Sequence, residues 1–198
     1  MNISPVVLEG ANVRLEPLSM AHHAGLCEVG LDAGLWEITM TLIRTPEEMA
    51  DYIRIALKLQ QEGFALPFAI IAKADRKAVG STRFGNVDKV NRRVEIGWTW
   101  VATPWQRGVV NTEAKYLLVT HAFETLGCIR VEFKTDVINM KSRNALIRIG
   151  AKEEGVLRKH MITPKGRIRD TVYYSIIDSE WPTVKRKLEE KMRLYGKR

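Results

Sequence analysis

The segment Gln106–Ala114 combines the features of an anion-binding turn. A turn containing Arg107 and Gly108 follows a β-rich run that ends at Val101, and a helical pattern starts at Thr112. Such a turn brings free backbone N–H groups and the positive end of a helix dipole to one point, and Arg107 adds a full charge. The segment therefore predicts a phosphate site, while a single glycine is equally compatible with an ordinary strand-to-helix loop.

The overall charge of the chain also favours anionic partners. The 198 residues include 31 Lys and Arg against 23 Asp and Glu, a formal net charge of +8, and 45% of the residues are apolar. This length and apolar content predict one domain, residues 1–198, that buries its own core. The charge suits a phosphorylated cofactor, an acidic peptide or RNA, and does not choose among them.

Part of the positive charge is concentrated after Trp181. The basic residues there are Lys185, Arg186, Lys187, Lys191, Arg193, Lys197 and Arg198. Glu189 and Glu190 interrupt the run and Tyr195 is its one interleaved aromatic residue for base stacking, so a solvated helix face is the favoured interpretation. An RNA-binding or ribosome-binding protein remains the alternative that the net charge motivates.

The two cysteines and the hydropathy pattern indicate a cellular compartment. Cys27 and Cys128 are far apart and match no metal or disulfide spacing, so we expect neither a metal site nor a disulfide. No apolar run approaches the ~18 residues of a membrane span, and the first ten residues do not have the pattern of a signal peptide. We therefore expect a cytoplasmic protein without membrane association.

Turn residues and hydrophobic periodicity divide the chain into helices and strands. Thr45, Pro46 and Glu48 predict a capped helix start, with a helix over 46–61 that Gly63 ends. Further helices are expected over 112–126 and 141–149, and from about Ser179 to the end of the chain. The expected strands are 13–15, 68–72, 78–84, 93–101, 129–136, 156–162 and 168–177.

The order of these elements predicts an α/β (α+β) fold with a mixed, mostly antiparallel sheet flanked by helices. The strand, helix, strand unit over 93–136 implies one parallel pair inside the otherwise antiparallel sheet.

Eight segments, in this order and spacing, resemble the GNAT N-acetyltransferase superfamily, and specifically its branch similar to bacterial ribosomal-protein N-terminal acetyltransferases. The resemblance covers nearly the whole chain. It is carried by 13–18 (VRLEPL), 94–98 (VEIGW), 106–114 (QRGVVNTEA), 130–132 (RVE), 139–142 (NMKS), 150–151 (GA), 154–158 (EGVLR) and 169–175 (RDTVYYS).

The resemblance implies a sheet splayed open between the fourth and fifth strands, 93–101 and 129–136, with acetyl-CoA in the opening. Backbone groups near Trp100 and Val101 would pair with the pantetheine arm. The pyrophosphate would lie on the turn. The residues implied in cofactor binding are Trp100, Val101, Gln106, Arg107, Gly108, Val109, Val110, Asn111, Thr112, Asn139 and Ser142.

The turn departs from the family pattern at two positions. With the register fixed by 112–114, the two positions that usually hold small residues are Val109 and Asn111, and glycine stands one place early at Gly108. A β-branched Val109 does not readily take positive φ. Three outcomes remain open: a turn reshaped around Gly108 with Asn111 capping the helix, weaker cofactor binding, or loss of binding.

Glu95 is the candidate catalytic base, directly or through water, because it lies mid-strand beside the implied opening. An acyl transfer to an amine needs a neutral amine, donors for the developing oxyanion and a proton for the leaving thiolate. Backbone N–H groups near Trp100 would serve the oxyanion. The alternative for Glu95 is a structural carboxylate paired with Arg92, Arg93 or Arg130.

Ser142 is the candidate proton donor. Many GNAT enzymes use a tyrosine in the helix after the fifth strand as this donor, and Leu146 occupies that position here. The ribosomal-protein branch instead has a serine early in that helix, and Ser142 is similar to it in position. The alternative is a first-turn serine that bonds its own backbone beside the cap Asn139. Tyr173 and Tyr174 alternate on the last strand, so one of them should point into the core.

Four aromatic residues and one histidine are further candidates for substrate contact. Trp36, Trp98, Trp105 and Phe84 could line an acceptor pocket, although scattered aromatics more often pack in the core. His160 could face an acidic acceptor or the CoA phosphates, or could simply be exposed in a basic strand.

The function expected from the resemblance is acetyl transfer from acetyl-CoA to a primary amine by direct attack. The family branch points to a protein N-terminal α-amine, to the ribosome or a ribosomal protein as partner, and to a homodimer. Alternatives are a catalytically weak CoA-binding regulatory module and an acetyltransferase for amino acids, polyamines or antibiotics.

Overall fold

The computed structural model describes residues 1–195, which form one eight-stranded sheet in the order β1-β2-β3-β4-β5-β6-β8-β7. Lys197 and Arg198 of the basic run lie outside this range. The strands are β1 (Leu8–Glu9), β2 (Val13–Pro17), β3 (Leu66–Ala72), β4 (Lys77–Asp88), β5 (Arg93–Val101), β6 (Arg130–Asp136), β7 (Lys152–Ile162) and β8 (Ile168–Ile177). The short β1 was not expected from the sequence.

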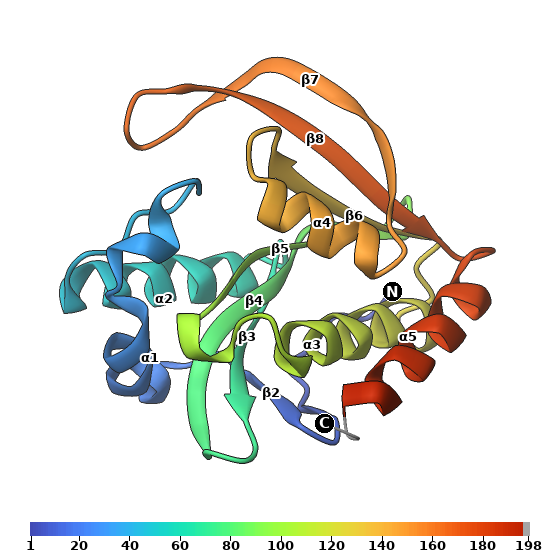
Figure 1. Cartoon of the computed structure of the whole chain (residues 1–198), viewed down its shortest axis with the longest axis horizontal. Helices are drawn as coiled ribbons and strands as arrows, with labels where there is room; N and C mark the ends of the chain where they lie inside the picture. Colours follow the sequence, from blue (N-terminus) through green and yellow to red (C-terminus); the bar gives the residue numbers. More distant parts are fainter. Residues whose placement is uncertain (196–198) are drawn as a thin grey trace.

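Five α-helices lie on the two faces of the sheet (Figure 1). They are α1 (His23–Gly30), α2 (Pro46–Gln61), α3 (Val109–Thr120), α4 (Met140–Arg148) and α5 (Trp181–Tyr195). None of the helices in residues 1–195 is both long enough and apolar enough to cross a membrane.

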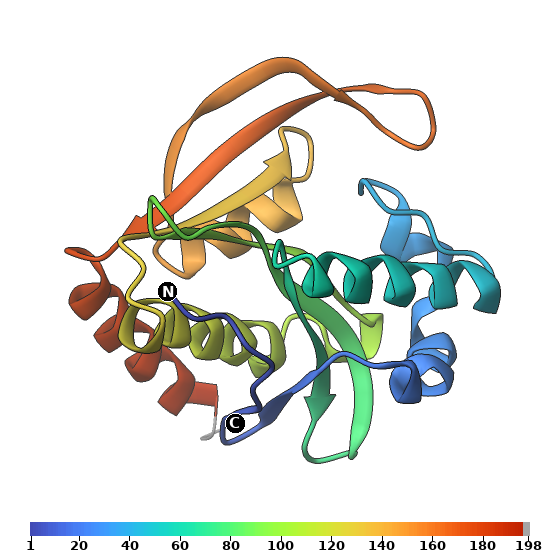
Figure 2. The same ribbon diagram turned by 180° about the vertical axis from the view of Figure 1, so that it is seen from behind.

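The predicted sheet, mixed and mostly antiparallel, is confirmed. Every neighbouring pair is antiparallel except β5 and β6, which run parallel. These two strands pair only over Arg93–Glu95 and Arg130–Glu132, although β5 continues to Val101 and β6 to Asp136. Beyond the paired residues the strands diverge, and the opening between them is visible in Figures 1 and 2. The predicted splay between 93–101 and 129–136 is present.

The start of α2 follows the sequence prediction, with one correction. The Thr45 hydroxyl accepts the Glu48 N–H at 3.2 Å, and Pro46 is the first helical residue. Glu48 does not close a capping box onto Thr45. Its carboxylate instead accepts the Arg44 backbone N–H at 2.6 Å and pairs with the Arg44 guanidinium.

The helix predicted over 112–126 begins three residues earlier than expected. Its cap residue is Gly108, so α3 starts at Val109, and a π-helical segment from His121 to Thr125 completes it. The expectation that Asn111 caps the helix is therefore wrong, because Asn111 lies inside the first turn. Helix α4 is correctly predicted, with Asn139 as its cap.

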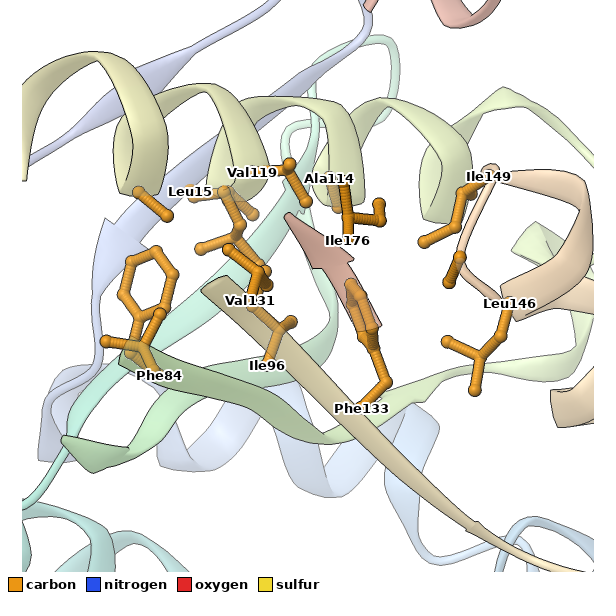
Figure 3. Packing of buried hydrophobic residues seen from close by; sticks show 14 of the residues in the cluster. Leu15, Phe84, Ile96, Ala114, Val119, Val131, Phe133, Leu146, Ile149 and Ile176 are labelled. Atoms are coloured by element: carbon orange, nitrogen blue, oxygen red, sulfur yellow. The ribbon is translucent and has the colours of Figure 1, made fainter. Parts of the chain in front are cut away.

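The largest hydrophobic core lies between the sheet and helices α3, α4 and α5 (Figure 3). Val94 and Ile96 of β5 point into it, as do Val131 and Phe133 of β6. A second cluster packs α1 and α2 against the sheet. Because side chains alternate along a strand, Glu95 points to the face of β5 opposite Val94 and Ile96.

The basic segment after Trp181 is partly docked onto the rest of the fold. Lys185 pairs with Glu124 at 2.7 Å, and the Lys191 ammonium donates to the Arg148 carbonyl at 3.2 Å. These contacts agree with a packed helix that has a solvated face rather than a free basic strip.

Candidate active site

The turn before α3 is reshaped around Gly108. Positive φ falls on Arg107, at +62°, while Gly108 is extended with φ −111° and ψ −160°. Val109 has ordinary helical geometry as the first residue of α3. The steric conflict expected for a β-branched Val109 is therefore absent, and Arg107 carries the strained conformation instead.

The N-terminus of α3 is free to accept an anion. No side chain of residues 1–195 caps it, and within this range a Cβ on Gly108 would meet no atom within 4 Å. The first N–H groups of a helix have no partner inside the helix and need an external acceptor. The exposed Arg107 stands beside them. A phosphate group fits this end of α3 by both charge and hydrogen bonding.

The Gln106 side chain ties the two sides of the opening together. Its amide donates to the Val101 carbonyl at 2.6 Å, and its oxygen accepts a hydrogen bond from Lys141 in α4. Gln106 therefore fixes the turn against β5 and against the start of α4. The Gln106 side chain therefore positions the turn rather than offering a free group to a ligand.

A bulge in β5 lies beside the opening. The ladder with β4 pairs Ser81 with Trp100 and Arg83 with Gly97, so β5 has one extra residue between these pairs. Trp98 takes a φ of +50° at this point. A bulge leaves backbone groups unpaired and re-aims the strand. The Trp100 side chain is buried against Trp36, with ring centroids 5.4 Å apart, so Trp100 offers its main chain to the site.

Glu95 has two polar partners, and neither is one of the arginines expected from the sequence. Asn86 donates to Oε2 of Glu95 at 2.6 Å, and the Lys134 ammonium lies 2.8 Å from the same oxygen. Burial, the largest single influence, disfavours the charged form of Lys134, but the hydrogen bonds and charges of Glu95 and Tyr173 together outweigh it, so the pKa of Lys134 lies above its ordinary value. No hydrogen-bond partner within residues 1–195 occupies Oε1 of Glu95.

The expected partners Arg93 and Arg130 bind Glu132 instead. Their guanidinium groups contact Oε1 of Glu132 at 3.0 and 2.9 Å. Glu132 is the register partner of Glu95 across the parallel pair. The two strands thus carry two buried carboxylates at equivalent positions, and only Glu132 is held by two arginines.

Asn139 and Ser142 form the start of α4. The Asn139 carbonyl oxygen accepts the Ser142 N–H at 3.0 Å, and its amide donates to the Ile38 carbonyl at 3.3 Å. The Ser142 hydroxyl makes no hydrogen bond to any part of the chain that the structure describes, so the backbone bond considered as its alternative role is not formed. Ser142 is half-buried and its hydroxyl is available.

The other candidates fall into core and surface positions. Leu146 and Tyr174 are buried in the main core, and Tyr174 donates to Glu153 at 2.8 Å. Tyr173 lies on the opposite face, where its ring is 4.9 Å from the Lys134 ammonium. His160 is exposed on β7, with its ring 6.0 Å from that of Tyr173.

The four aromatic candidates lie in three different environments. Trp98 borders a cavity of about 320 Å³ beside α2. Trp36 and Phe84 are buried in the two core clusters. Trp105 donates its indole N–H to Asp75 at 2.7 Å.

Comparison with known proteins assigns the family. The family model for the acetyltransferase (GNAT) domain matches residues 12–152. The chain is a GNAT N-acetyltransferase. It is 30% identical over 160 residues to "Uncharacterized N-acetyltransferase p20" of Bacillus licheniformis, covering 79% of this chain and 87% of the relative.

Two further GNAT proteins extend the comparison. "Putative ribosomal N-acetyltransferase YdaF" of Bacillus subtilis is 39% identical over 107 residues, 54% of this chain and 57% of that protein. The crystal structure of a GCN5-related N-acetyltransferase from Brucella melitensis superposes with a TM-score of 0.89 at 31% identity, covering 96% of this chain and 86% of that one. The GNAT fold and dependence on acetyl-CoA follow from this membership.

The geometry of this GNAT enzyme suits acetyl-CoA. The uncapped end of α3 with Arg107, Gly108 and Val109 can hold the pyrophosphate, and the unpaired edge of β5 near Trp100 and Val101 can pair with amide groups. Val110 and Asn111 complete the first helical turn, while Thr112 is fully buried and belongs to the core side of α3.

The sequence prediction missed Arg83 and Lys115, both of which are buried. Arg83 lies on β4 at 2% exposure, within a run otherwise interpreted as apolar strand. Lys115 lies on α3 at 5% exposure, and its ammonium nitrogen is 2.5 Å from the Thr99 hydroxyl. A charged residue inside each hydrophobic pattern was the available signal, because such residues are rarely buried without a role or a partner.

Proposed function

We propose that this enzyme acetylates a protein N-terminal α-amine by direct attack of the amine on the thioester, without a covalent enzyme intermediate. The observation that carries the proposal is the divergence of β5 from β6 beside the uncapped end of α3, with Glu95 on the open face of β5. When bound, acetyl-CoA supplies the activated acetyl group. The residues of the chain hold the reactants and move protons.

Glu95 takes the role of general base. Asn86 and Lys134 hold Oε2, which leaves Oε1 to accept a proton from the attacking amine, directly or through a water molecule. Backbone N–H groups near Trp100 or Val101, next to the bulge at Trp98, would stabilise negative charge on the carbonyl oxygen.

Ser142 takes the role of proton donor to the leaving thiolate. Its hydroxyl has no other partner in the described chain, and Asn139 fixes its backbone at the start of α4. Lys141 links this end of α4 to Gln106 at the pyrophosphate turn. The departing sulfur would thus lie near Ser142, and α4, which carries Ser142, is linked to the same turn that would hold the CoA phosphates.

The choice of acceptor is supported by the name of the Bacillus subtilis relative, which refers to the ribosome. A ribosomal protein is therefore our first acceptor, and small amines are the second. A weak CoA-binding module loses one of its two motivations, because Val109 has helical geometry in the reshaped turn. The other motivation, the absence of a tyrosine at the position of Leu146, remains.

Two measurements test the proposal. Calorimetric titration with acetyl-CoA measures cofactor binding. Release of CoA is then followed with ribosomal-protein N-terminal peptides, amino acids, polyamines and aminoglycosides as acceptors. We expect binding, and turnover with N-terminal peptides. Binding without turnover on any amine would support the CoA-binding module and contradict the enzymatic proposal.

A matched pair of variants tests the base. Glu95→Gln should lower kcat by about 10² to 10⁴, the usual contribution of a general base. Glu132→Gln changes the register partner, which lies on the adjacent strand, and should leave kcat within about threefold, because only groups close to the reacting atoms transfer protons.

A further inference from the structure

A cavity of about 320 Å³ lies on the side of the sheet covered by α2. Its walls come from α2 and from the segment Met40–Ile43, and Arg83 of β4 and Trp98 of β5 border it. It is thus bounded by the bulged strand that carries Glu95. None of the cofactor-binding residues predicted from the sequence lines this cavity.

Arg83 is a buried cation without a counter-ion. The residue is 2% exposed, its Nε has no hydrogen-bond partner, and no carboxylate of residues 1–195 lies within 4.0 Å of it. Its guanidinium carbon lies 4.9 Å from the centroid of the Tyr52 ring and 5.1 Å from that of the Trp98 ring. Aromatic faces stabilise a guanidinium but leave its N–H groups unpaired.

The carboxylates that border the cavity are engaged with other arginines. Glu48 pairs with Arg44 at 2.5 Å, and Asp51 pairs with Arg54 one turn further along α2. Each of these pairs is neutral as a unit. Arg83 is therefore the uncompensated charge of the cavity, and a buried unpaired donor of this kind is costly unless a ligand satisfies it.

The shape of the site favours a carboxylate. The guanidinium carbon lies over the faces of two aromatic rings, and the N–H groups of a guanidinium lie in the plane of its fork. A planar carboxylate can accept two parallel hydrogen bonds in that plane. One arginine also matches the single charge of a carboxylate better than the charge of nearly −2 on a phosphate monoester.

The position of Arg83 sets the distance between a bound carboxylate and the reacting amine of the same acceptor. Arg83 pairs with Gly97 in the ladder, and Glu95 is two residues from Gly97 on the same face of β5. Two residues of strand span roughly 7 Å. An amine separated from a carboxylate by a few bonds can therefore approach Glu95 while the carboxylate remains on Arg83.

We propose that Arg83, whose guanidinium lies over the rings of Tyr52 and Trp98, binds a carboxylate of the acceptor that lies a few bonds from the amine to be acetylated. This inference rests on the proposed acetyltransferase function and names its substrate class. The carboxylate can come from an acidic side chain at the first or second residue of a protein N-terminus, or from the α-carboxylate of a free amino acid.

The first test uses the unmodified protein. Peptides with Glu or Gln at the first or second position, amidated at the C-terminus, are compared with free glutamate and its α-amide. We expect kcat/KM to be about tenfold or more higher for the acidic member of a pair, the usual effect of a charge-assisted bidentate contact. A preference among the peptides alone identifies the side chain as the source, and a preference for free glutamate identifies the α-carboxylate. Equal rates within every pair would overturn the inference.

The second test uses variants of the arginine. Arg83→Met should remove the preference for acidic acceptors, and Arg83→Lys should retain part of it, because a lysine keeps the charge but not the fork. The matched control Arg186→Met removes an exposed arginine of α5, which does not border the cavity, and should keep the preference. Affinity for acetyl-CoA should be unchanged in all three. Equal loss on acidic and amide acceptors in Arg83→Met would contradict the proposal.

A binding measurement separates this inference from the proposed function. N-acetylated acidic peptides and their amide counterparts are titrated calorimetrically into the protein saturated with CoA. Tighter binding of the acidic member, lost in Arg83→Met, supports the carboxylate site even where no amine is turned over. Turnover without any difference between acid and amide, in rate or in binding, would retain the enzyme and remove the carboxylate site.

Discussion

The ammonium nitrogen of Lys115 lies 2.5 Å from the hydroxyl of Thr99, which in turn is 2.7 Å from the hydroxyl of Thr82. This chain of polar groups joins α3 to β5 and β4 directly beside the bulge at Trp98. No carboxylate pairs with Lys115 in the described chain, and burial lowers the pKa of Lys115 to about 7. The lysine therefore favours a neutral amine near physiological pH.

The buried Lys115 predicts a pH dependence of stability. Between pH about 7 and the ordinary lysine value of about 10.4, the unfolded chain holds a proton that the folded chain has released. The free energy of unfolding should therefore rise with pH across this window, by up to about 1.4 kcal/mol per pH unit. Urea unfolding at pH 7, 8 and 9 measures it.

The variant Lys115→Met should lack this rise, since it has no proton to release. Lys77→Met, which removes an exposed lysine paired with Glu28 at 3.6 Å, is the matched control and should keep it. If the free energy of unfolding changed with pH in the same way in the unmodified protein and in Lys115→Met, burial would not lower the pKa of Lys115.

A second prediction concerns Arg107, whose φ of +62° suits asparagine and glycine better than arginine. Arg107→Asn removes the charge without adding strain. We expect stability to change by less than about 1 kcal/mol, whereas the Kd for CoA should increase several-fold because a cation beside the pyrophosphate is lost.

Ionic strength distinguishes this effect from a change in turn geometry. Calorimetric titration of CoA at low and high salt should show the difference between Arg107→Asn and the unmodified protein shrinking as salt rises. A difference that is independent of salt would indicate that Arg107 shapes the turn rather than attracting the phosphates.

Much of the fold could be predicted from the sequence because its signals are local. Thr45 and Pro46 mark the start of α2, Asn139 marks the start of α4, and alternating residues mark the strands. The start of α3 was misplaced, because the helical spacing of apolar residues was recognised only from Thr112 onward. The structure moves positive φ to Arg107 and starts the helix earlier, a rearrangement that no local pattern shows.

Side-chain partners were harder to predict than elements. The alternative role of Glu95 named Arg92, Arg93 or Arg130 as its partner. In the structure Arg93 and Arg130 bind Glu132, and Lys134 reaches Glu95 across the opening. Arg83 and Lys115 were missed for the same reason. Their surroundings come from Tyr52, 31 residues before Arg83, and from Thr99, 16 residues before Lys115, which only the three-dimensional fold brings together.

A third prediction uses the close approach of Glu95 to Gly97. A Cβ at position 97 would lie 3.0 Å from Oε1 of Glu95, the oxygen assigned to proton transfer. Gly97→Ala should therefore lower kcat/KM by about tenfold, because the methyl group covers that oxygen and displaces the amine. Steady-state kinetics with a saturating level of acetyl-CoA measures the effect.

The double variant gives the critical comparison. If Gly97→Ala acts through Glu95, adding it to Glu95→Gln should cost little more than Glu95→Gln alone, because the two changes share one target. Gly25→Ala, whose added Cβ makes an ordinary contact at 3.7 Å, is the control and should leave kinetics unchanged. Fully additive losses would place the effect of Gly97→Ala elsewhere.

A fourth prediction concerns the proton that the leaving thiolate receives. The Ser142 hydroxyl has no partner in the described chain, so Ser142→Ala removes no internal hydrogen bond and should change stability by less than about 0.5 kcal/mol. Its kcat should fall by about 10² if the hydroxyl donates the proton in the rate-limiting step. Ser142→Thr keeps a hydroxyl and should retain most of the activity.

The solvent isotope effect and KM for acetyl-CoA together determine whether the loss of activity in Ser142→Ala lies in the proton-transfer step. A proton donated in the rate-limiting step should give kcat a solvent isotope effect that the alanine variant reduces, whereas KM for acetyl-CoA stays the same. An increase in that KM with unchanged kcat would assign Ser142 to cofactor binding, the other role expected for it, because such a change removes binding common to ground and transition states.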